Sequence, residues 1–418
     1  MSKNNIINVV CFDQEIGRIG YDENQNKTFF QYNPNFLKSG LYPNLFPLVI
    51  KRIPQTQVFS QFNNDTFRNL PPMFADSLPD TFGNIIFKTW LATKGIDKIS
   101  ILEQLAYVAN RGMGALAYQP SMPIPRNTSI DIDEIVDVLK RVLDSKGSTV
   151  DKTLDSKSLL NIFKMGSSAG GMQPKILIAE HKKTGKIIPG DVEYSNSYHH
   201  YLVKLHLNLE EKYNKEIIEY SYYLTATSLG INMMPSKLVD HRHFATLRYD
   251  RQDGKKIHTL TATGLTGWDF KNPAVSSYEH LFDLAHFLKL PHSEIEELFT
   301  RMVFNLVFAN ADDHLKNHAF SYDEQNNQWH LAPAYDITYA LNPLLNYKRS
   351  SRALSINNKR NDITLADILK IAYQNTIKNP KGIFEKTIAA ISVWEQHAHQ
   401  LHIPLIVIDN IKKNLWQC

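Results

Sequence analysis

The sequence has few cysteines and no long apolar segment. Only two of its 418 residues are cysteine, Cys11 and Cys418, which excludes a disulfide framework and a cysteine-based zinc site and is typical of a reducing cytosol. No run approaches the roughly 18 apolar residues of a membrane-spanning helix, and residues 1–5 lack the apolar core of a signal peptide. We therefore expect a cytoplasmic protein that has no membrane partner.

The sequence also lacks a strong excess of charge of either sign. Its 46 basic and 42 acidic residues give a formal net charge of +4, which permits contact with nucleic acid or acidic partners but does not require it. Basic clusters at 347–352, 359–360 and 412–413 are interpreted most simply as solvated surface. A hydrophobic fraction of 43% in a chain of this length predicts a globular protein of two or three domains.

The chain divides into two β-rich parts and a helical part. Residues 6–60 contain short alternating segments separated by turn residues, and the glycine-rich segment 111–116 ends this first part. Further strand patterns surround one long helix up to about residue 250, and helical patterns dominate after it. We therefore expect an α+β protein with domains at residues 1–125, 126–250 and 251–418.

The most informative pattern is Asp312, followed five residues later by Asn317 and, after a short hairpin, by Asp336. Kinases arrange their phosphoryl-transfer groups in this order: the first acid receives the proton of the attacking hydroxyl, and the amide and the second acid hold Mg²⁺ on the nucleotide phosphates. The hairpin is predicted from two apolar segments, 320–322 and 329–331, which flank a polar turn. It would bring Asp336 back beside Asn317.

Lys204 and Glu219, which lie much earlier in the chain, extend this kinase-like set. Lys204 is a lone cation in the apolar strand 201–205, and a buried lysine needs a partner. Glu219 lies in a helix that we expect from about residue 213 to 229, and kinases pair a strand lysine with a helix glutamate and with nucleotide phosphates. On the strand alone, Lys204 could equally lie at an edge and reach solvent, and Glu219 alone could be a solvated helix residue.

A loop of small residues at 165–175 precedes Lys204. Glycine and serine allow backbone N–H groups to approach phosphate oxygens closely. The loop matches neither the Walker A pattern nor the GxGxxG of protein kinases, and such loops are often ordinary turns. Its candidate phosphate-binding residues are Ser167, Ser168, Gly170, Gly171 and Lys175.

The residues around Asp312 have two other interpretations. Asp312, Asp313 and His314 could bind the metal of a hydrolase, although no HExxH motif accompanies them. The segment could also be a polar loop with one capping aspartate and one buried, hydrogen-bonded aspartate. In the kinase interpretation His314 orients Asp312 or packs within the loop, and only the spacing to Asn317 selects Asp312 rather than Asp313 as the base.

With these features in this order, the chain resembles the HipA family, the serine/threonine-kinase toxins of bacterial toxin–antitoxin pairs. The resemblance covers nearly the whole chain, and the segment from Asp312 to Asn317 is its most specific part. The segments that carry it are 70–83, 111–116, 167–175, 248–251, 304–320 and 333–336.

The resemblance implies a protein-kinase-like two-lobed fold with an additional N-terminal β-rich subdomain and an all-helical C-terminal lobe. It implies ATP and Mg²⁺ as cofactors, with Asp312 as the catalytic base and Asn317 and Asp336 as metal ligands. Leu247 to Tyr249 would be the hinge whose backbone meets adenine. The implied nucleotide-binding residues are Ser167, Ser168, Gly170, Gly171, Lys175, Lys204, Glu219, Leu247, Tyr249 and His314.

The resemblance also implies regulation and partners. Autophosphorylation at Ser168 or Ser167 would silence the enzyme, a HipB-like helix-turn-helix antitoxin would neutralise it, and operator DNA would be bound mainly through that antitoxin. The protein substrate would be an aminoacyl-tRNA synthetase or another translation protein, but Met172, Pro174 and the divergent segment 252–278 depart from the family pattern and leave the substrate open. Two alternatives remain: a weakly catalytic corepressor partner of a DNA-binding antitoxin, and a small-molecule kinase.

Overall fold

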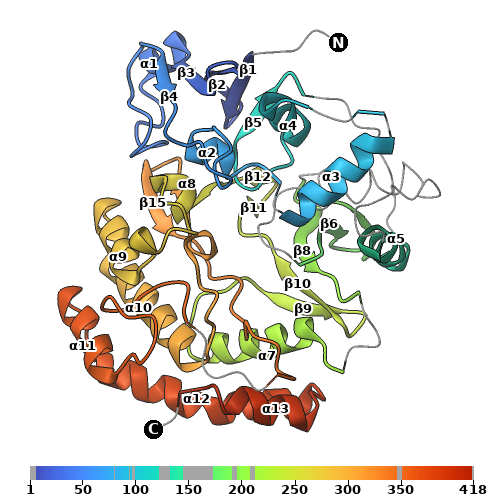
Figure 1. Cartoon of the computed structure of the whole chain (residues 1–418), viewed down its shortest axis with the longest axis vertical. Coiled ribbons are helices and arrows are strands. Elements are labelled where there is room, and N and C mark those ends of the chain that lie inside the picture. The colour runs from blue at the N-terminus through green and yellow to red at the C-terminus, as the bar shows by residue number, and fades with distance from the viewer. Residues whose placement is uncertain are drawn as a thin grey trace.

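The structure is a computed structural model that describes residues 6–79, 81–93, 95–96, 99–121, 132–144, 173–190, 195–207, 212–345 and 351–416. Within these residues, two antiparallel sheets of five strands are followed by a mainly helical part that carries a smaller sheet (Figure 1). No helix of this part of the chain combines the length and the apolar character that crossing a membrane requires.

The N-terminal sheet has the strand order β4-β3-β2-β1-β5. Burial alternates along its strands, as expected for a sheet with one face in the core. In β1, Ile7, Val9 and Cys11 are buried, whereas the residues between them are only partly buried. Helix α4 packs against this sheet and begins with a capping box between Ser100 and Glu103. The elements are β1 (Ile6–Cys11), β2 (Gln14–Asp22), β3 (Lys27–Tyr32), α1 (Pro34–Ser39), β4 (Gln57–Phe59), α2 (Pro72–Ala75), α3 (Thr81–Thr93), α4 (Ile101–Val108) and β5 (Ala117–Gln119).

The second sheet has the order β7-β6-β8-β10-β9, with β8 in its centre. Apolar side chains of one face, among them Ile176, Ile178 and Val203, form a core with α3 and α5. Helix α7 packs against β9 and β10. The elements are α5 (Ile132–Asp144), β6 (Lys175–His181), β7 (Ile187–Pro189), β8 (Tyr198–Lys204), α7 (Lys215–Ser228), β9 (Ser236–Val239) and β10 (His243–Leu247).

The C-terminal lobe is mainly helical but carries the sheet β13-β14-β15 and the two-stranded sheet β11-β12, so the expectation of an all-helical lobe is corrected in this respect. The hairpin predicted at 320–331 forms, and β13 joins it because Leu260 pairs with Phe320. The elements are β11 (Arg251–Gln252), β12 (Lys255–Lys256), β13 (His258–Thr261), α8 (Ala262–Thr266), α9 (Tyr278–Phe287), α10 (His292–Val307), β14 (Ala319–Asp323), β15 (Gln328–Leu331), α11 (Leu365–Gln374), α12 (Pro380–Gln400) and α13 (Leu405–Lys412), with 3-10 turns η1 (Pro273–Val275) and η2 (Leu315–Asn317).

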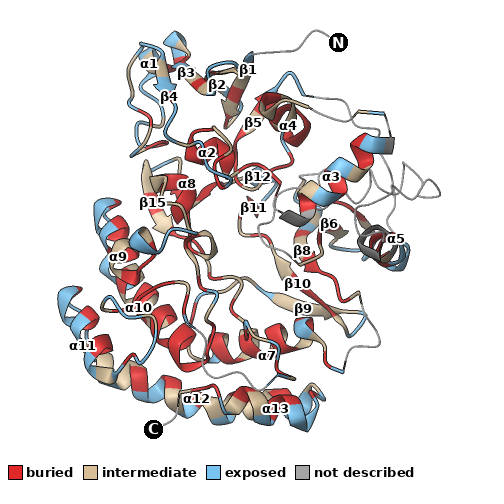
Figure 2. Cartoon of the chain, viewed as in Figure 1, coloured by how far each residue is buried: buried red, intermediate tan, exposed pale blue. Residues whose placement is uncertain are grey.

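Helices α10 and α12 support the candidate site from within the C-terminal lobe. Helix α10 is buried throughout residues 301–307, the half that leads into the loop containing Asp312 (Figure 2). Helix α12 packs along α7, where Trp394 Nε1 donates a hydrogen bond of 3.0 Å to Ser221 Oγ and the Trp394 ring lies 5.9 Å from that of Tyr222. The helix that carries Glu219 is therefore held between the second sheet and α12.

His258 lies in an aromatic enclosure between the N-terminal and C-terminal parts. Its ring is 6.4 Å from Phe12 and 6.2 Å from Phe46 on one side, and 6.4 Å from Tyr322 and 5.5 Å from Trp329 on the other. The residue is 0% exposed. Burial among apolar rings disfavours the charged imidazolium and lowers the pKa of His258 to about 3.

We predict that His258→Phe weakens the loss of stability on acidification. The folded protein keeps this histidine neutral down to about pH 3, whereas the unfolded chain takes up a proton below about pH 6.5. Stability is therefore lost as the pH falls below that value, and the variant should recover about 2 kcal/mol of the free energy of unfolding at pH 5 relative to pH 7.

Urea unfolding at the two pH values measures this effect. His399 is exposed on α12, and the same change there should alter the free energy of unfolding by no more than about 0.5 kcal/mol. An unchanged pH dependence for His258→Phe would show that the folded protein already protonates this ring.

Candidate active site

Lys204 ends β8, the central strand of the second sheet. It pairs in register with Phe244 of β10 on one side and with Lys175 of β6 on the other. The alternative of an edge lysine that reaches solvent is therefore wrong. Lys175 and Lys204 are both buried, and like charges directly opposite each other in a sheet are unfavourable unless negative groups offset them.

Two acids from distant parts of the chain surround the Lys204 ammonium. Its Nζ donates to both carboxylate oxygens of Glu219, at 2.7 and 2.8 Å, and also to Oδ1 of Asp336. The side chains of Lys204 and Glu219 are 7% and 5% exposed, whereas that of Asp336 is 25% exposed. The structure thus brings these three predicted residues together, with Asp336 on the side that solvent can reach.

Shared charge governs the pKa values of this triad. Burial alone would lower the pKa of Lys204, but the carboxylates of Asp336 and Glu219 outweigh it and raise that pKa. Burial would raise the pKa of Asp336, but the ammonium groups of Lys204 and Lys175 lower it. For Glu219, burial dominates and raises the pKa despite Lys204. Asp336 is therefore the acid of this triad that most firmly stays an anion.

The predicted catalytic loop is closed by hydrogen bonds onto Asp312. The backbone oxygen of Asp312 accepts from His314 N and from Asn317 Nδ2, both at 2.9 Å, and Asn317 N donates to His314 O at 2.8 Å. These bonds fix the five-residue spacing as a compact turn that ends in η2. The Asp312 side chain lies at the surface, where it can meet another molecule.

The hairpin β14–β15 returns the chain so that Asp336 lies beside this loop. Asp336 has a left-handed backbone, with φ of 53°, and its carbonyl accepts a hydrogen bond of 3.3 Å from Asn310 Nδ2. Asp336 and Asn317 line one small pocket, part of which is open to solvent. The spacing predicts that these two residues lie near each other, and both line this pocket.

Neighbouring acids also affect Asp312. Desolvation by the surrounding chain raises its pKa, and the negative charges of Asp336 and Asp313 raise it further, while His314 opposes them. A carboxyl with a raised pKa is a better proton acceptor than an ordinary surface aspartate once it is ionised. The location of Asp312 therefore suits proton transfer.

Asp313 has a different environment from its neighbour Asp312. It is 1% exposed, and its Oδ2 accepts a hydrogen bond of 2.6 Å from Tyr278 Oη and another from Arg352 Nη2. Arg352 also donates to the backbone oxygen of Asn305 at 3.1 Å. Asp313 therefore anchors the loop in the lobe and cannot reach a substrate, which removes it as the alternative base.

Arg352 and Arg360 correct the interpretation of the basic clusters as solvated surface. Arg352 is 6% exposed, and Arg360 donates to the backbone oxygens of Arg352, Ala353, Pro273 and Ser276. No sequence signal identified Arg352 or its partner Tyr278. A basic cluster has no periodicity, and only the fold reveals that one member of it is buried.

The remaining predicted residues have varied environments. The His314 ring packs 4.8 Å from Phe270. At the hinge, Leu247 N donates to Pro235 O at 2.9 Å, and the Tyr249 ring stacks 6.1 Å from that of Tyr335. The loop residues Ser167, Ser168, Gly170 and Gly171 lie outside the described residues.

The side chains of the candidate site can be compared with the ligands that Mg²⁺ prefers. In the described part of the chain, no three His, Cys, Asp or Glu side chains gather as a metal site. Mg²⁺ needs fewer protein ligands, because one or two oxygen side chains, phosphates and waters complete its shell. Asp336 and the Asn317 amide can supply such oxygens, so the residues fit Mg²⁺ bound together with nucleotide phosphates.

Buried polar side chains line the pocket beside Asn317 and Asp336. Arg301 Nη2, Asp313 Oδ1 and His318 Nε2 are buried there and have no hydrogen-bond partner among the described residues. Buried polar atoms of this kind usually bind water. The cavity therefore suits the waters that accompany a hydrated cation.

We predict that Arg352→Ala lowers the free energy of unfolding by roughly 3–5 kcal/mol, because it leaves the buried carboxylate of Asp313 without its cation. The matched change is Arg18→Ala, whose partner Glu15 lies at 3.5 Å and whose own side chain is 64% exposed. That change should cost about 1 kcal/mol or less. Urea unfolding compares the two, and equal losses would contradict the anchoring role of Arg352.

Comparisons with known proteins bear on the fold and the family of the chain. Among solved structures, the chain is similar to the HipA chain of the Shewanella oneidensis MR-1 toxin–antitoxin complex of HipA, HipB and operator DNA, with 18% identity, coverage of 98% of this chain and 96% of that chain, and a TM-score of 0.67. The Helicobacter pylori proinflammatory kinase CtkA matches over 53% of this chain and 89% of its own, with 14% identity and a TM-score of 0.35, which is too low to support an inference.

No curated protein sequence matches the chain significantly. The HipA N-terminal domain, however, matches residues 7–119, and the HipA-like C-terminal domain matches residues 167–396, which is more than half of the chain. The chain therefore belongs to the HipA family of toxins and has the kinase-like fold of that family.

Proposed function

We propose that this protein is a Mg·ATP-dependent protein serine/threonine kinase that acts as the toxin of a toxin–antitoxin pair. The observation that carries the proposal is the Lys204 ammonium held between Glu219 and Asp336, with Asn317 lining the same cavity as Asp336. This arrangement gathers a phosphate-binding cation and two metal-ligand side chains at one point, as phosphoryl transfer requires.

Each residue then has a defined role. Asp312 accepts the proton of the attacking hydroxyl, while Asn317 and Asp336 hold Mg²⁺, which neutralises charge on the nucleotide phosphates when it is bound. Glu219 keeps the Lys204 ammonium directed at Asp336, so that Lys204 is already placed to bind phosphate oxygens. The three protons of the Lys204 ammonium are all engaged, so its contact with Asp336 would open when Lys204 binds phosphate and Asp336 binds the metal.

The hinge and the small-residue loop complete the nucleotide site in this proposal. Leu247 N and Arg248 N already donate within the chain, to Pro235 O and His200 O, so adenine would meet the backbone of Tyr249. The loop at 165–175 would cover the phosphates. Phosphorylation of Ser168 or Ser167 in that loop would place added negative charge where the phosphates bind and would thereby silence the enzyme.

The relative from Shewanella oneidensis was solved with HipB and operator DNA. By analogy we propose that this chain is neutralised by a HipB-like helix-turn-helix antitoxin and meets operator DNA mainly through it. The proposed protein substrate is an aminoacyl-tRNA synthetase or another translation protein. A second candidate role, corepressor with little catalysis, is favoured by the same complex. A wild type that joins an antitoxin–operator complex but never turns over ATP would support that role.

Asp312→Asn tests the proposal directly. We expect the wild type to transfer phosphate from ATP in a Mg²⁺-dependent manner, to itself or to water. The variant should react about 10²–10⁴ times more slowly because it lacks the proton acceptor. Its affinity for Mg·ATP, measured by calorimetry, should remain that of the wild type, because the metal-ligand side chains are intact.

The control is Asp253→Asn, in an exposed turn distant from the loop in sequence, which should leave the rate unchanged. If Asp312→Asn and the wild type reacted at the same rate, Asp312 would have no part in the mechanism. If the wild type bound no Mg·ATP, the kinase proposal itself would fail.

A further inference from the structure

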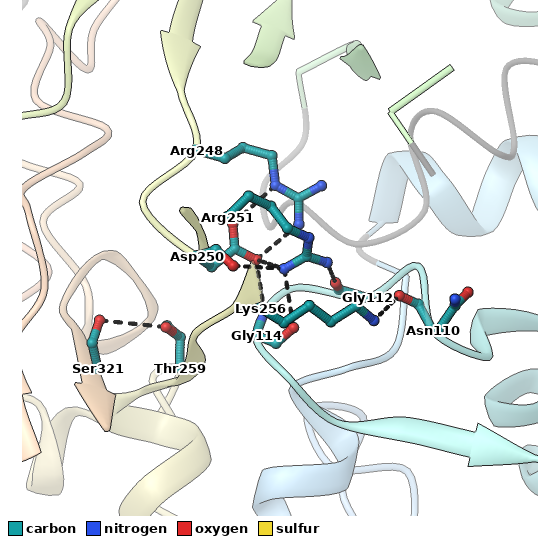
Figure 3. A network of polar contacts seen from close by, with 9 residues as sticks. All are labelled: Asn110, Gly112, Gly114, Arg248, Asp250, Arg251, Lys256, Thr259 and Ser321. Atoms are coloured by element: carbon teal, nitrogen blue, oxygen red, sulfur yellow. Dashed lines mark hydrogen bonds and ion pairs between the residues drawn. The ribbon is translucent and has the colours of Figure 1, made fainter. Parts of the chain in front are cut away.

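A loop of the N-terminal subdomain is hydrogen-bonded to the segment that follows the hinge (Figure 3). Arg251 donates from Nη1 to Gly114 O at 3.1 Å and from Nη2 to Gly112 O at 2.9 Å. In the opposite direction, Gly114 N donates to Asp250 Oδ2 at 2.8 Å. We call this set of bonds between residues 112–114 and residues 250–251 the clasp.

Asp250 is the centre of the clasp. It is 0% exposed, and its carboxylate accepts from Arg248 Nε at 2.9 Å, from Arg248 Nη2 at 2.8 Å and from Arg251 Nη1 at 2.7 Å. Burial would raise the pKa of Asp250, but the two guanidinium groups lower it well below its usual range. A buried carboxylate bound on both oxygens by planar forks has little freedom to shift.

The loop is pressed closely against strand β13. Gly114 has a φ of +75°, and a Cβ at this position would lie 2.8 Å from the backbone oxygen of Thr259. Glycine is therefore required both for the backbone conformation and for the close approach. Lys256 Nζ donates to Asn110 O and adds a further bond between the two segments (Figure 3).

The clasp immediately follows the residues proposed to meet adenine. Arg248 N donates to His200 O of the central strand β8 at 2.8 Å, while Asp250 is held by the clasp. Tyr249 lies between these two fixed neighbours, and its ring stacks on that of Tyr335, the residue before Asp336. A displacement of Asp250 or Arg251 would therefore move the backbone of Tyr249.

We propose that Arg251 is a positioning residue for nucleotide binding, through which the loop 112–114 of the N-terminal subdomain sets the position of the hinge. This inference rests on the proposed function, because it takes Leu247 to Tyr249 as the adenine-binding backbone. The N-terminal subdomain is then a working part of the nucleotide site. A ligand bound to that subdomain and a nucleotide at the hinge would influence each other's affinity.

The first test compares Arg251→Met with Arg52→Met in the full-length chain. Arg52 also lies in the N-terminal part and also donates to backbone oxygens, those of Leu41 and Tyr42 at 2.9 and 3.3 Å. Its bonds do not involve the hinge. Amide hydrogen exchange over residues 244–252 should quicken in Arg251→Met and remain that of the wild type in Arg52→Met.

Calorimetry with Mg·ATP provides the second readout. Arg251→Met should weaken the affinity about tenfold or more, because a misplaced contact loses most of its binding energy, whereas kcat at saturating ATP should fall by no more than about threefold. Arg52→Met should change neither quantity. Equal effects of the two variants on exchange and affinity would show general loosening of the subdomain and would overturn the proposal.

Gly114→Ala and Gly40→Ala are an independent pair that keeps every charge. Both glycines have a positive φ, of +75° and +68°, but a Cβ at Gly40 meets nothing within 4 Å. The backbone strain is therefore similar, and only the first variant disturbs the clasp. Gly114→Ala should quicken amide hydrogen exchange at the hinge and weaken the binding of Mg·ATP, and Gly40→Ala should do neither.

The two proposals fail in distinguishable ways. If the wild type binds Mg·ATP and neither clasp variant affects hinge exchange or affinity, the clasp has no positioning role and the kinase proposal stands. If the wild type binds no Mg·ATP, the kinase proposal fails and the role of the clasp in nucleotide binding fails with it. Hinge exchange then decides only whether the clasp holds the hinge in place.

Discussion

One buried ammonium joins the three elements on which the candidate site depends. Lys204 comes from the central strand of the second sheet, Glu219 from helix α7 and Asp336 from the segment after β15. A buried charge is costly unless it is paired, so the ion contacts hold sheet, helix and loop in one arrangement. The loop from Asp312 to Asn317 borders the same pocket as Asp336, and the proposed hinge follows β10, the neighbour of β8 in the sheet.

Two adjacent carboxylates show how the fold separates structural and chemical roles. Asp313 is buried, and its Oδ2 is bound by Tyr278 and Arg352 and so holds the loop in the lobe. Asp312 reaches the surface, where only its backbone oxygen is engaged by the loop. Because Asp313 anchors the loop in the lobe, the loop cannot shift relative to Asn317 and Asp336. The exposed carboxylate of Asp312 is therefore held in a fixed position.

Short-range spacing in the sequence was enough to predict part of the candidate site, whereas the rest depends on packing between distant segments. The interval from Asp312 to Asn317 and the hairpin after it were enough to predict that Asn317 and Asp336 would line one pocket, because both features depend on short segments. The pairing of Lys204 with Glu219 followed from the kinase template. The order of the strands, the third strand of the C-terminal sheet and the burial of Arg352 could not be predicted, because each depends on contacts between segments far apart in the chain. Arg352 contacts Asp313 across 39 residues, and nothing in a basic cluster indicates which member turns inward.

The packing of α12 on α7 has a consequence for folding during translation. Trp394 covers the helix that carries Glu219, yet it is translated long after that helix has left the ribosome. Until residues 380–400 emerge from the exit tunnel, the outer face of α7 lacks its cover. The partner of Lys204 is consequently fully supported only once residues 380–400 have folded against α7, so a growing polypeptide passes through much of its synthesis with this part of the candidate site incomplete.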